Sequence, residues 1–98
     1  MSYYFEWDPG KAAANLRKHG VSFDEATAVF GDPVAMNMRD PAHSLNEERF
    51  VLLGMSRGLR LLVVAYAERG TWTRLISARE ATREERRQYE EGPEKTKH

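Results

Sequence analysis

Four arginines lie in the most apolar part of the chain, residues 59–80, which read LRLLVVAYAERGTWTRLISARE. Arg79 stands near the end of this stretch, just ahead of a predicted helix whose free N-terminal N–H groups also attract anions. A planar guanidinium group matches phosphate with two parallel hydrogen bonds. Arg79 is therefore the first candidate for a phosphate-binding role, followed by Arg74 and Arg60.

The charge distribution also favours the second half of the chain. The formal net charge is zero, yet residues 1–48 carry four basic and eight acidic side chains, whereas residues 49–87 carry nine arginines and four acids. An arginine-rich half is the better candidate for contact with nucleic acid. The alternative is that these arginines form ion pairs, for example Arg79 with Glu80 or Glu85, and only stabilise the fold.

The elements that must position these arginines follow from residue patterns. Residues 59–67 hold one charge and predict a central buried strand, and the polar break at residues 68–71 predicts a hairpin into a second strand at residues 72–78. Alternation along the second strand puts Arg74 on one face of the sheet and Arg79 on the other.

The rest of the chain predicts an α+β domain. Asp8 and Pro9 predict a helix start and Gly20 its end, and Ser22 with Glu25 predicts a second helix. The expected order is an N-terminal strand at residues 3–7, two helices, four antiparallel strands in a meander covered on one face by the helices, and a last helix from residue 82. We expect a single domain at residues 1–92 and a frayed tail at residues 93–98.

Composition excludes several classes of function. The chain has no cysteine, which excludes disulfides, thiolate catalysis and Cys-type zinc sites. No HExxH or comparable spacing predicts a metal site, and no cofactor is expected. The longest apolar run is far shorter than the roughly 20 residues of a membrane span, so we expect no membrane contact. No signal peptide is visible, and the cytoplasm is the expected location.

Five blocks of sequence occur in a fixed order: FEWDP at residues 5–9, NLRKHGVSFDEA at 15–26, VFGDP at 29–33, EER at 47–49 and ISAREATREERRQYE at 76–90. Together they resemble the BrnT family of toxins from bacterial type II toxin-antitoxin modules. The resemblance implies a RelE-like ribonuclease fold, RNA cleavage that inhibits translation, and neutralisation by a BrnA-type antitoxin. It implies contact with operator DNA only through that antitoxin, in a dimer or heterotetramer.

Metal-independent RNA cleavage needs a base for the 2′-hydroxyl, cations around the transition state and an acid for the leaving 5′-oxygen. The candidates beside Arg79 are His19, whose pKa class suits work near neutral pH, Lys11 and Glu48. His19 could instead cap the end of its helix, and Glu48 could be an ordinary surface residue. Lys11 lies in the first turn of a helix, where a cation is unfavourable to the helix dipole.

Trp7 is the candidate for base stacking, with a place in the core as its alternative. The three binding candidates are therefore Arg74, Arg60 and Trp7. A rival function from another class is a non-catalytic module that binds RNA or scaffolds a repressor complex.

Overall fold

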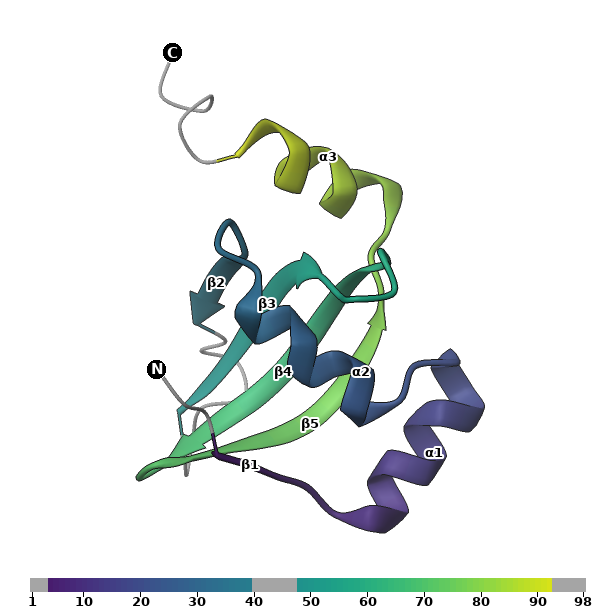
Figure 1. Ribbon diagram of the computed structural model, residues 1–98, viewed down its shortest axis with the longest axis vertical. Helices are drawn as coiled ribbons and strands as arrows, with labels where there is room; N and C mark the ends of the chain where they lie inside the picture. The colour runs from purple at the N-terminus through teal and green to yellow at the C-terminus, as the bar shows by residue number, and fades with distance from the viewer. Residues whose placement is uncertain (1–3, 40–47, 93–98) are drawn as a thin grey trace.

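The computed structural model describes residues 4–39 and 48–92, in which a five-stranded sheet organises the chain (Figure 1). The elements are β1 (Tyr4–Glu6), α1 (Pro9–His19), α2 (Phe23–Thr27), the 3₁₀ helix η1 (Ala28–Gly31), β2 (Met36–Arg39), β3 (Arg49–Met55), β4 (Leu61–Arg69), β5 (Trp72–Glu80) and α3 (Arg83–Glu91). The strand order is β1-β5-β4-β3-β2. Residues 40–46, whose turn-forming sequence DPAHSLN predicts a loop, and the expected tail at residues 93–98 lie outside the described residues.

The α+β prediction is confirmed. The strands β2, β3, β4 and β5 form an antiparallel meander, and β1 joins its edge parallel to β5. Asp8 caps α1 by accepting a hydrogen bond from the backbone N–H of Lys11, and Gly20 ends the helix with φ of 70°. Ser22 caps α2 in the same way. The helix α2 ends at Thr27, because after this residue the chain tightens into η1.

A close approach between η1 and β3 depends on a glycine. A Cβ at Gly54 would lie 2.8 Å from Cγ1 of Val29 and 2.9 Å from Cβ of Ala35. Both neighbours belong to the packed interior, so no larger side chain fits at this position without a shift of η1. The contact lets η1 lie across the sheet and close the core.

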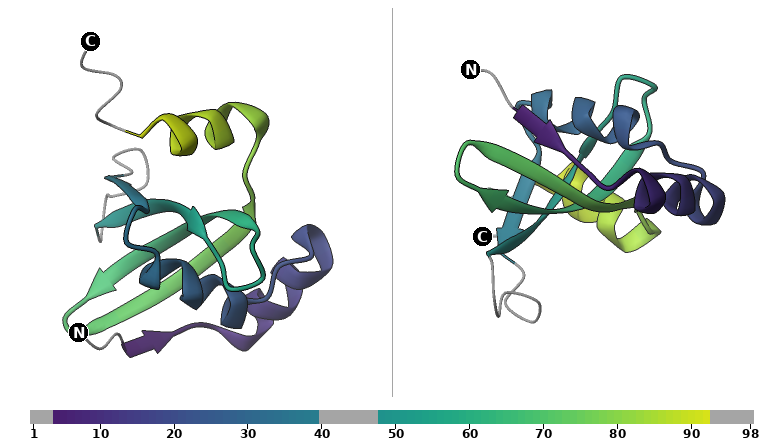
Figure 2. Two further views of the ribbon diagram at one scale, coloured as in Figure 1. Left: turned by 45° about the horizontal axis from the view of Figure 1, so that its top comes forward. Right: turned by 90° about the horizontal axis from the view of Figure 1, so that it is seen from below.

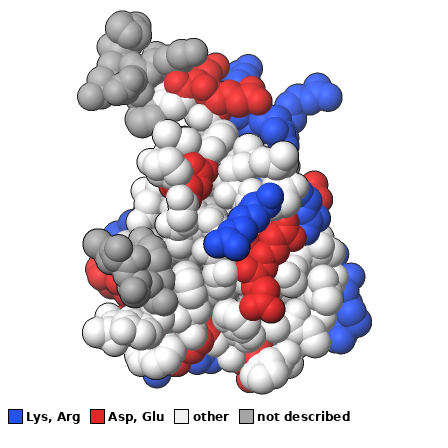
Figure 3. Space-filling model, in the orientation of Figure 1, with Lys and Arg blue, Asp and Glu red and all other residues white. Residues whose placement is uncertain are grey.

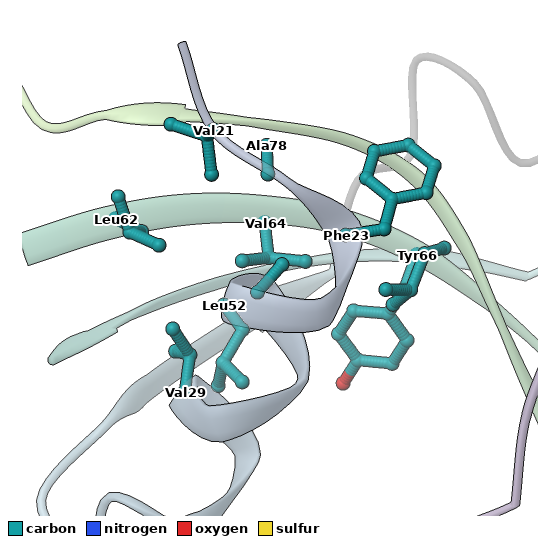
Figure 4. Close-up of a cluster of buried hydrophobic side chains, with 10 residues drawn as sticks. Val21, Phe23, Val29, Leu52, Leu62, Val64, Tyr66 and Ala78 are labelled. Atoms are coloured by element: carbon teal, nitrogen blue, oxygen red, sulfur yellow. The ribbon is translucent and has the colours of Figure 1, made fainter. Parts of the chain in front are cut away.

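Helices lie on both faces of the sheet, which corrects the expected single covered face. Figure 2 (right) shows α2 and η1 on one side, α3 on the other and α1 at the edge beside β5. The main core fills the space under α2 and η1 (Figure 4), and its buried members are Val21, Phe23, Ala26, Val29, Leu52, Leu62, Val64, Tyr66, Leu75 and Ala78. On the other face Ala81 and Tyr89 pack on a smaller cluster formed by Leu53, Leu61 and Val63. The hydroxyl of Tyr89 also donates to Asp32, 2.6 Å away.

The pairing of β4 with β5 contains a β-bulge that changes which residues share a face. Ala65 pairs with Ser77 but Tyr66 pairs with Leu75, so β5 has one extra residue, Ile76. Beyond the bulge the alternation of β5 is inverted. Arg74 and Arg79 therefore lie on the same face of the sheet, and the prediction of opposite faces is wrong.

None of the helices in the described part of the chain is long and apolar enough to cross a membrane.

Candidate functional site

The face of the sheet opposite α2 and η1 carries most of the arginines of the strands. We call it the arginine face; it comprises Tyr4 and Glu6 of β1, Trp72, Arg74, Ser77 and Arg79 of β5, Ala65, Ala67 and Arg69 of β4, and Arg49 and Val51 of β3. Among the described elements only α3 covers part of this side, at the end where Val63 and Leu53 lie. On the other side, basic side chains are scattered among acidic ones and do not gather (Figure 3).

Arg79 lies where the arginine face meets α3. Its Nη1 donates to Oε1 of Glu85 and its Nη2 to Oε2, both at 2.9 Å, and Nη1 also donates to the carbonyl of Glu80 at 3.2 Å. These contacts raise the pKa of Arg79 and, opposed by burial, lower the pKa of Glu85 to about 2. Sequence analysis gave the Glu85 pair only as an alternative to phosphate binding. With 40% of the Arg79 side chain exposed, the two roles are compatible.

Arg74 is a half-buried residue of this face. No ion pair to Arg74 is formed by any of the described residues. In the sheet it lies between Glu6 of β1 and Ala67 of β4. The carboxylate of Glu6 lies 3.6 Å from Nη1 of Arg69, a partly exposed pair that leaves Arg74 open to a ligand.

Arg60, in contrast, is a structural residue. Its Nε and Nη2 donate to the two carboxylate oxygens of Glu25, Nη2 also donates to the carbonyl of Gly20 at 3.0 Å, and Nη1 donates to Glu80 at 2.9 Å. The same contact with Arg60 lowers the pKa of Glu25, to which Ser56 donates as well. The group joins the loop after α1 to α2 and β5, on the side away from the arginine face. The structure therefore gives no support to RNA binding by Arg60.

The helix α1 lies beside β5 because Asn15 bonds to the free backbone of that strand. Its Nδ2 donates to the carbonyl of Ala78 at 2.8 Å and of Val21 at 2.9 Å, and its Oδ1 accepts from the N–H of Ala78 at 3.1 Å. Asn15 is 7% exposed. The strand β1 pairs with β5 only at residues 72–74. Further along β5, the side chain of Asn15 bonds to the strand edge as the backbone of a neighbouring strand would.

The orientation of α1 sorts its charged residues between the two faces. Residues advance by about 100° in a helix, so with Asn15 facing β5, Ala12 and His19 lie to one side of it and Lys11 and Lys18 to the other. Ala12 packs on the main core. Lys11 and Lys18, both exposed, therefore project on the side of the arginine face, and His19 projects on the opposite side.

The remaining candidates are distributed away from this face. Trp7 packs edge-on against Phe23, with ring centroids 5.8 Å apart, as in the alternative that assigned it to the core. Glu48, just before β3, is exposed and pairs with Arg39 of β2 at 2.8 Å. The structure brings together Arg79, Arg74 and the side of α1 that bears Lys11, and leaves Trp7, His19, Glu48 and Arg60 elsewhere.

Three residues on or beside this face were missed by sequence reasoning. Trp72 is 46% exposed and its ring lies 5.7 Å from that of Tyr4, which forms an aromatic surface beside Arg69 and Arg74. The others are Ser77 of the same face and Lys18 of α1. Lys18 could have been identified from the sequence, because it follows Lys11 by seven residues and therefore lies on the same side of the helix. The place of Ser77 on this face could be seen only once the bulge in β5 was known.

The described residues contain no group of three or more His, Asp or Glu side chains placed to hold a metal ion.

This fold is that of a known class, the ribonuclease toxins of type II toxin-antitoxin systems. The model of the family described as "Ribonuclease toxin, BrnT, of type II toxin-antitoxin system" matches residues 7–85. The chain belongs to the BrnT family, which confirms the resemblance read from its sequence, and a toxin of a type II system has an antitoxin as its partner.

A solved structure has the same fold. The crystal structure of the ribonuclease toxin BrnT from Brucella abortus superposes on this chain with a TM-score of 0.66, and the two sequences are 24% identical. The match covers 84% of this chain and 100% of that chain. Among the curated proteins no match was found.

Proposed function

We propose that this chain is a metal-independent endoribonuclease that cleaves RNA bound on the arginine face and so inhibits translation. The observation that carries the proposal is the bulge in β5, which sets Arg74 and Arg79 on one face. The helical period of α1, with Asn15 facing β5, directs Lys11 and Lys18 toward the same face. In a chain of a ribonuclease toxin family, this face offers cations from two elements to one phosphodiester backbone.

The proposed reaction is attack of the RNA 2′-oxygen on the adjacent phosphorus, with loss of the 5′-oxygen. Arg79 binds the non-bridging phosphate oxygens and stabilises their charge in the transition state. Lys11 supplies further positive charge and a proton for the leaving oxygen. The proton of the 2′-hydroxyl passes to a water molecule. Glu6, the carboxylate directly beside Arg74 in the sheet, lies about four strand positions, roughly 13 Å, from Arg79 and does not reach the same phosphate. His19 and Glu48 lie away from this face and have no part in the proposed reaction.

We further propose that a BrnA-type antitoxin neutralises the chain in the cytoplasm and that its DNA-binding domain represses the operon. Dimers of the toxin and heterotetramers with the antitoxin are the expected assemblies. Size-exclusion chromatography with light scattering on the co-purified pair measures the stoichiometry, and a complex with one copy of each chain contradicts this expectation.

Cleavage is tested with the purified chain, free of antitoxin, and end-labelled RNA in EDTA, with and without ribosomes. The expected result is cleavage that EDTA does not prevent and that the antitoxin abolishes. Cleavage that requires a divalent ion overturns the metal-independent mechanism. RNA that is bound in a salt-dependent way but left intact supports the rival, a non-catalytic binding module.

The exposed Trp72 gives a prediction about base stacking. Trp72→Ala is expected to weaken RNA binding by about 5- to 150-fold, because stacking of one base contributes about 1–3 kcal/mol, and to leave the melting temperature nearly unchanged. Trp7→Ala is the matched control: its ring packs on Phe23, so it should lower the melting temperature strongly. Fluorescence anisotropy with labelled RNA measures the affinity, and equal affinities for Trp72→Ala and the unaltered chain exclude the stacking role.

A further inference from the structure

The guanidinium group of Arg79 is only partly used by the fold. Its Nη1 donates to Glu85 and to the carbonyl of Glu80, and its Nη2 donates once, to Glu85. A guanidinium group has five N–H donors. Two of them, Nε–H and the second Nη2–H, have no acceptor among the described residues.

These two donors lie along one edge of the guanidinium plane, and such an edge matches two oxygens of a phosphate. Arg60 shows the contrasting case, because its Nε and Nη2 edge is already occupied by Glu25. The two arginines thus have similar partners but differ in the edge that remains. Of these two, Arg79 keeps an unoccupied edge for a ligand.

Glu85 is itself held firmly. Its backbone N–H donates to Oγ1 of Thr82 at 3.2 Å, and its Oε1 accepts from the backbone N–H of Thr82 at 2.9 Å. The two contacts form a capping box at the start of α3. Since Arg79 lowers the pKa of Glu85 to about 2, the carboxylate stays ionised near neutral pH and is unsuited to proton transfer.

We infer that Glu85 is a positioning residue: its carboxylate fixes Arg79 through one edge of the guanidinium group, so that the other edge receives one RNA phosphate on the arginine face. The inference rests on the proposed function, because it takes RNA as the ligand of Arg79. It makes the first turn of α3 part of the substrate site.

The direction of one change distinguishes this role from the alternatives. Glu85→Gln removes a negative charge, so it should strengthen RNA binding if Glu85 acts only by long-range repulsion or competes with phosphate for Arg79. If Glu85 positions Arg79, the same change should weaken binding about three- to tenfold. Binding is measured with an RNA whose 2′-hydroxyls carry methyl groups, which cannot be cleaved by attack of the 2′-oxygen.

A double-mutant cycle completes the test. Arg79→Ala should reduce the salt dependence of binding by about 0.7 in the slope of log K against log salt, the value for one phosphate contact on a single strand. Adding Glu85→Gln to Arg79→Ala should change nothing further. Tighter binding or unchanged binding by Glu85→Gln, or a loss that persists without Arg79, overturns the inference.

Two controls separate positioning from helix stability. Thr82→Ala removes the helix cap but keeps the Glu85 side chain, so it should lower the melting temperature without weakening RNA binding. Glu84→Gln changes a neighbouring exposed carboxylate, which lies 3.6 Å from Arg87, and should not weaken binding. If Thr82→Ala weakens binding as much as Glu85→Gln, the role of Glu85 is structural. If the unaltered chain binds no RNA at all, the proposed function fails, which is a distinct result.

Discussion

Arg79→Ala is expected to reduce RNA cleavage by about 100- to 1000-fold, the usual loss when one donor to a transition-state oxyanion is removed. The same change should lower the melting temperature only slightly. In the ion pair of Arg79 with Glu85, 40% of the Arg79 side chain and 27% of the Glu85 side chain are exposed. An ion pair that solvent screens contributes about 0–1 kcal/mol to stability. For a domain of this size that corresponds to a shift of at most about 8 °C.

Arg79→Lys and Arg87→Ala are the comparisons for this prediction. Lysine keeps the charge but lacks the planar fork, so it should restore little of the activity. Arg87 lies on the exposed side of α3, near Glu84 and Glu91, and its loss should leave cleavage unchanged. Single-turnover cleavage and thermal denaturation on the same preparations give both quantities. A large loss of melting temperature with Arg79→Ala would assign this arginine to the fold.

The second large effect is expected from Asn15→Ala. The change removes the partners of three backbone groups, the N–H and C=O of Ala78 and the C=O of Val21. A buried polar group left without a partner costs about 1–3 kcal/mol, so we expect a loss of about 3–5 kcal/mol, which would lower the melting temperature by roughly 12–40 °C.

The direction of the stability change caused by Asn15→Ala distinguishes the edge-bonding role from an ordinary helical position. Alanine has a higher helix propensity than asparagine by up to about 0.7 kcal/mol, so the change should stabilise the protein if Asn15 were only a helical residue. Arg17→Ala, at an exposed position of the same helix, is the control and should change stability little. Urea denaturation measures both free energies of unfolding, and an unchanged or increased value for Asn15→Ala contradicts the edge-bonding role.

Local signals in the sequence predicted most of the fold. Asp8 and Ser22 cap α1 and α2 and Thr82 and Glu85 form the capping box of α3, as their residue types and spacing indicate. These signals act within a few residues, which is why one sequence is enough to find them. The pairing of β3, β4 and β5 was predictable for the same reason, since short loops connect these three strands.

The features that were not predictable depend on contacts between distant segments. The partners of Arg60 are Glu25, 35 residues away, and Glu80, 20 residues away, and no local pattern distinguishes this arginine from Arg74. The side of the sheet that α3 covers is likewise decided by Tyr89 and its bond to Asp32. In the candidate site, residue type identified Arg74 and Arg79, whereas their common face required the three-dimensional pairing of β5 with β4.

The extra residue in β5 has a consequence for how relatives of this chain should be compared. Arg74 and Arg79 are five positions apart, an odd separation that would normally divide two side chains between opposite surfaces of a strand, and they share one surface because Ile76 is inserted between them. A homologue that lacks one residue here would need no bulge, because two arginines four positions apart share a surface by ordinary alternation. A homologue that keeps the five-residue spacing but pairs the two strands without a bulge would direct one of the arginines into the interior, so the strand pairing carries information about activity that the identity of the arginines does not.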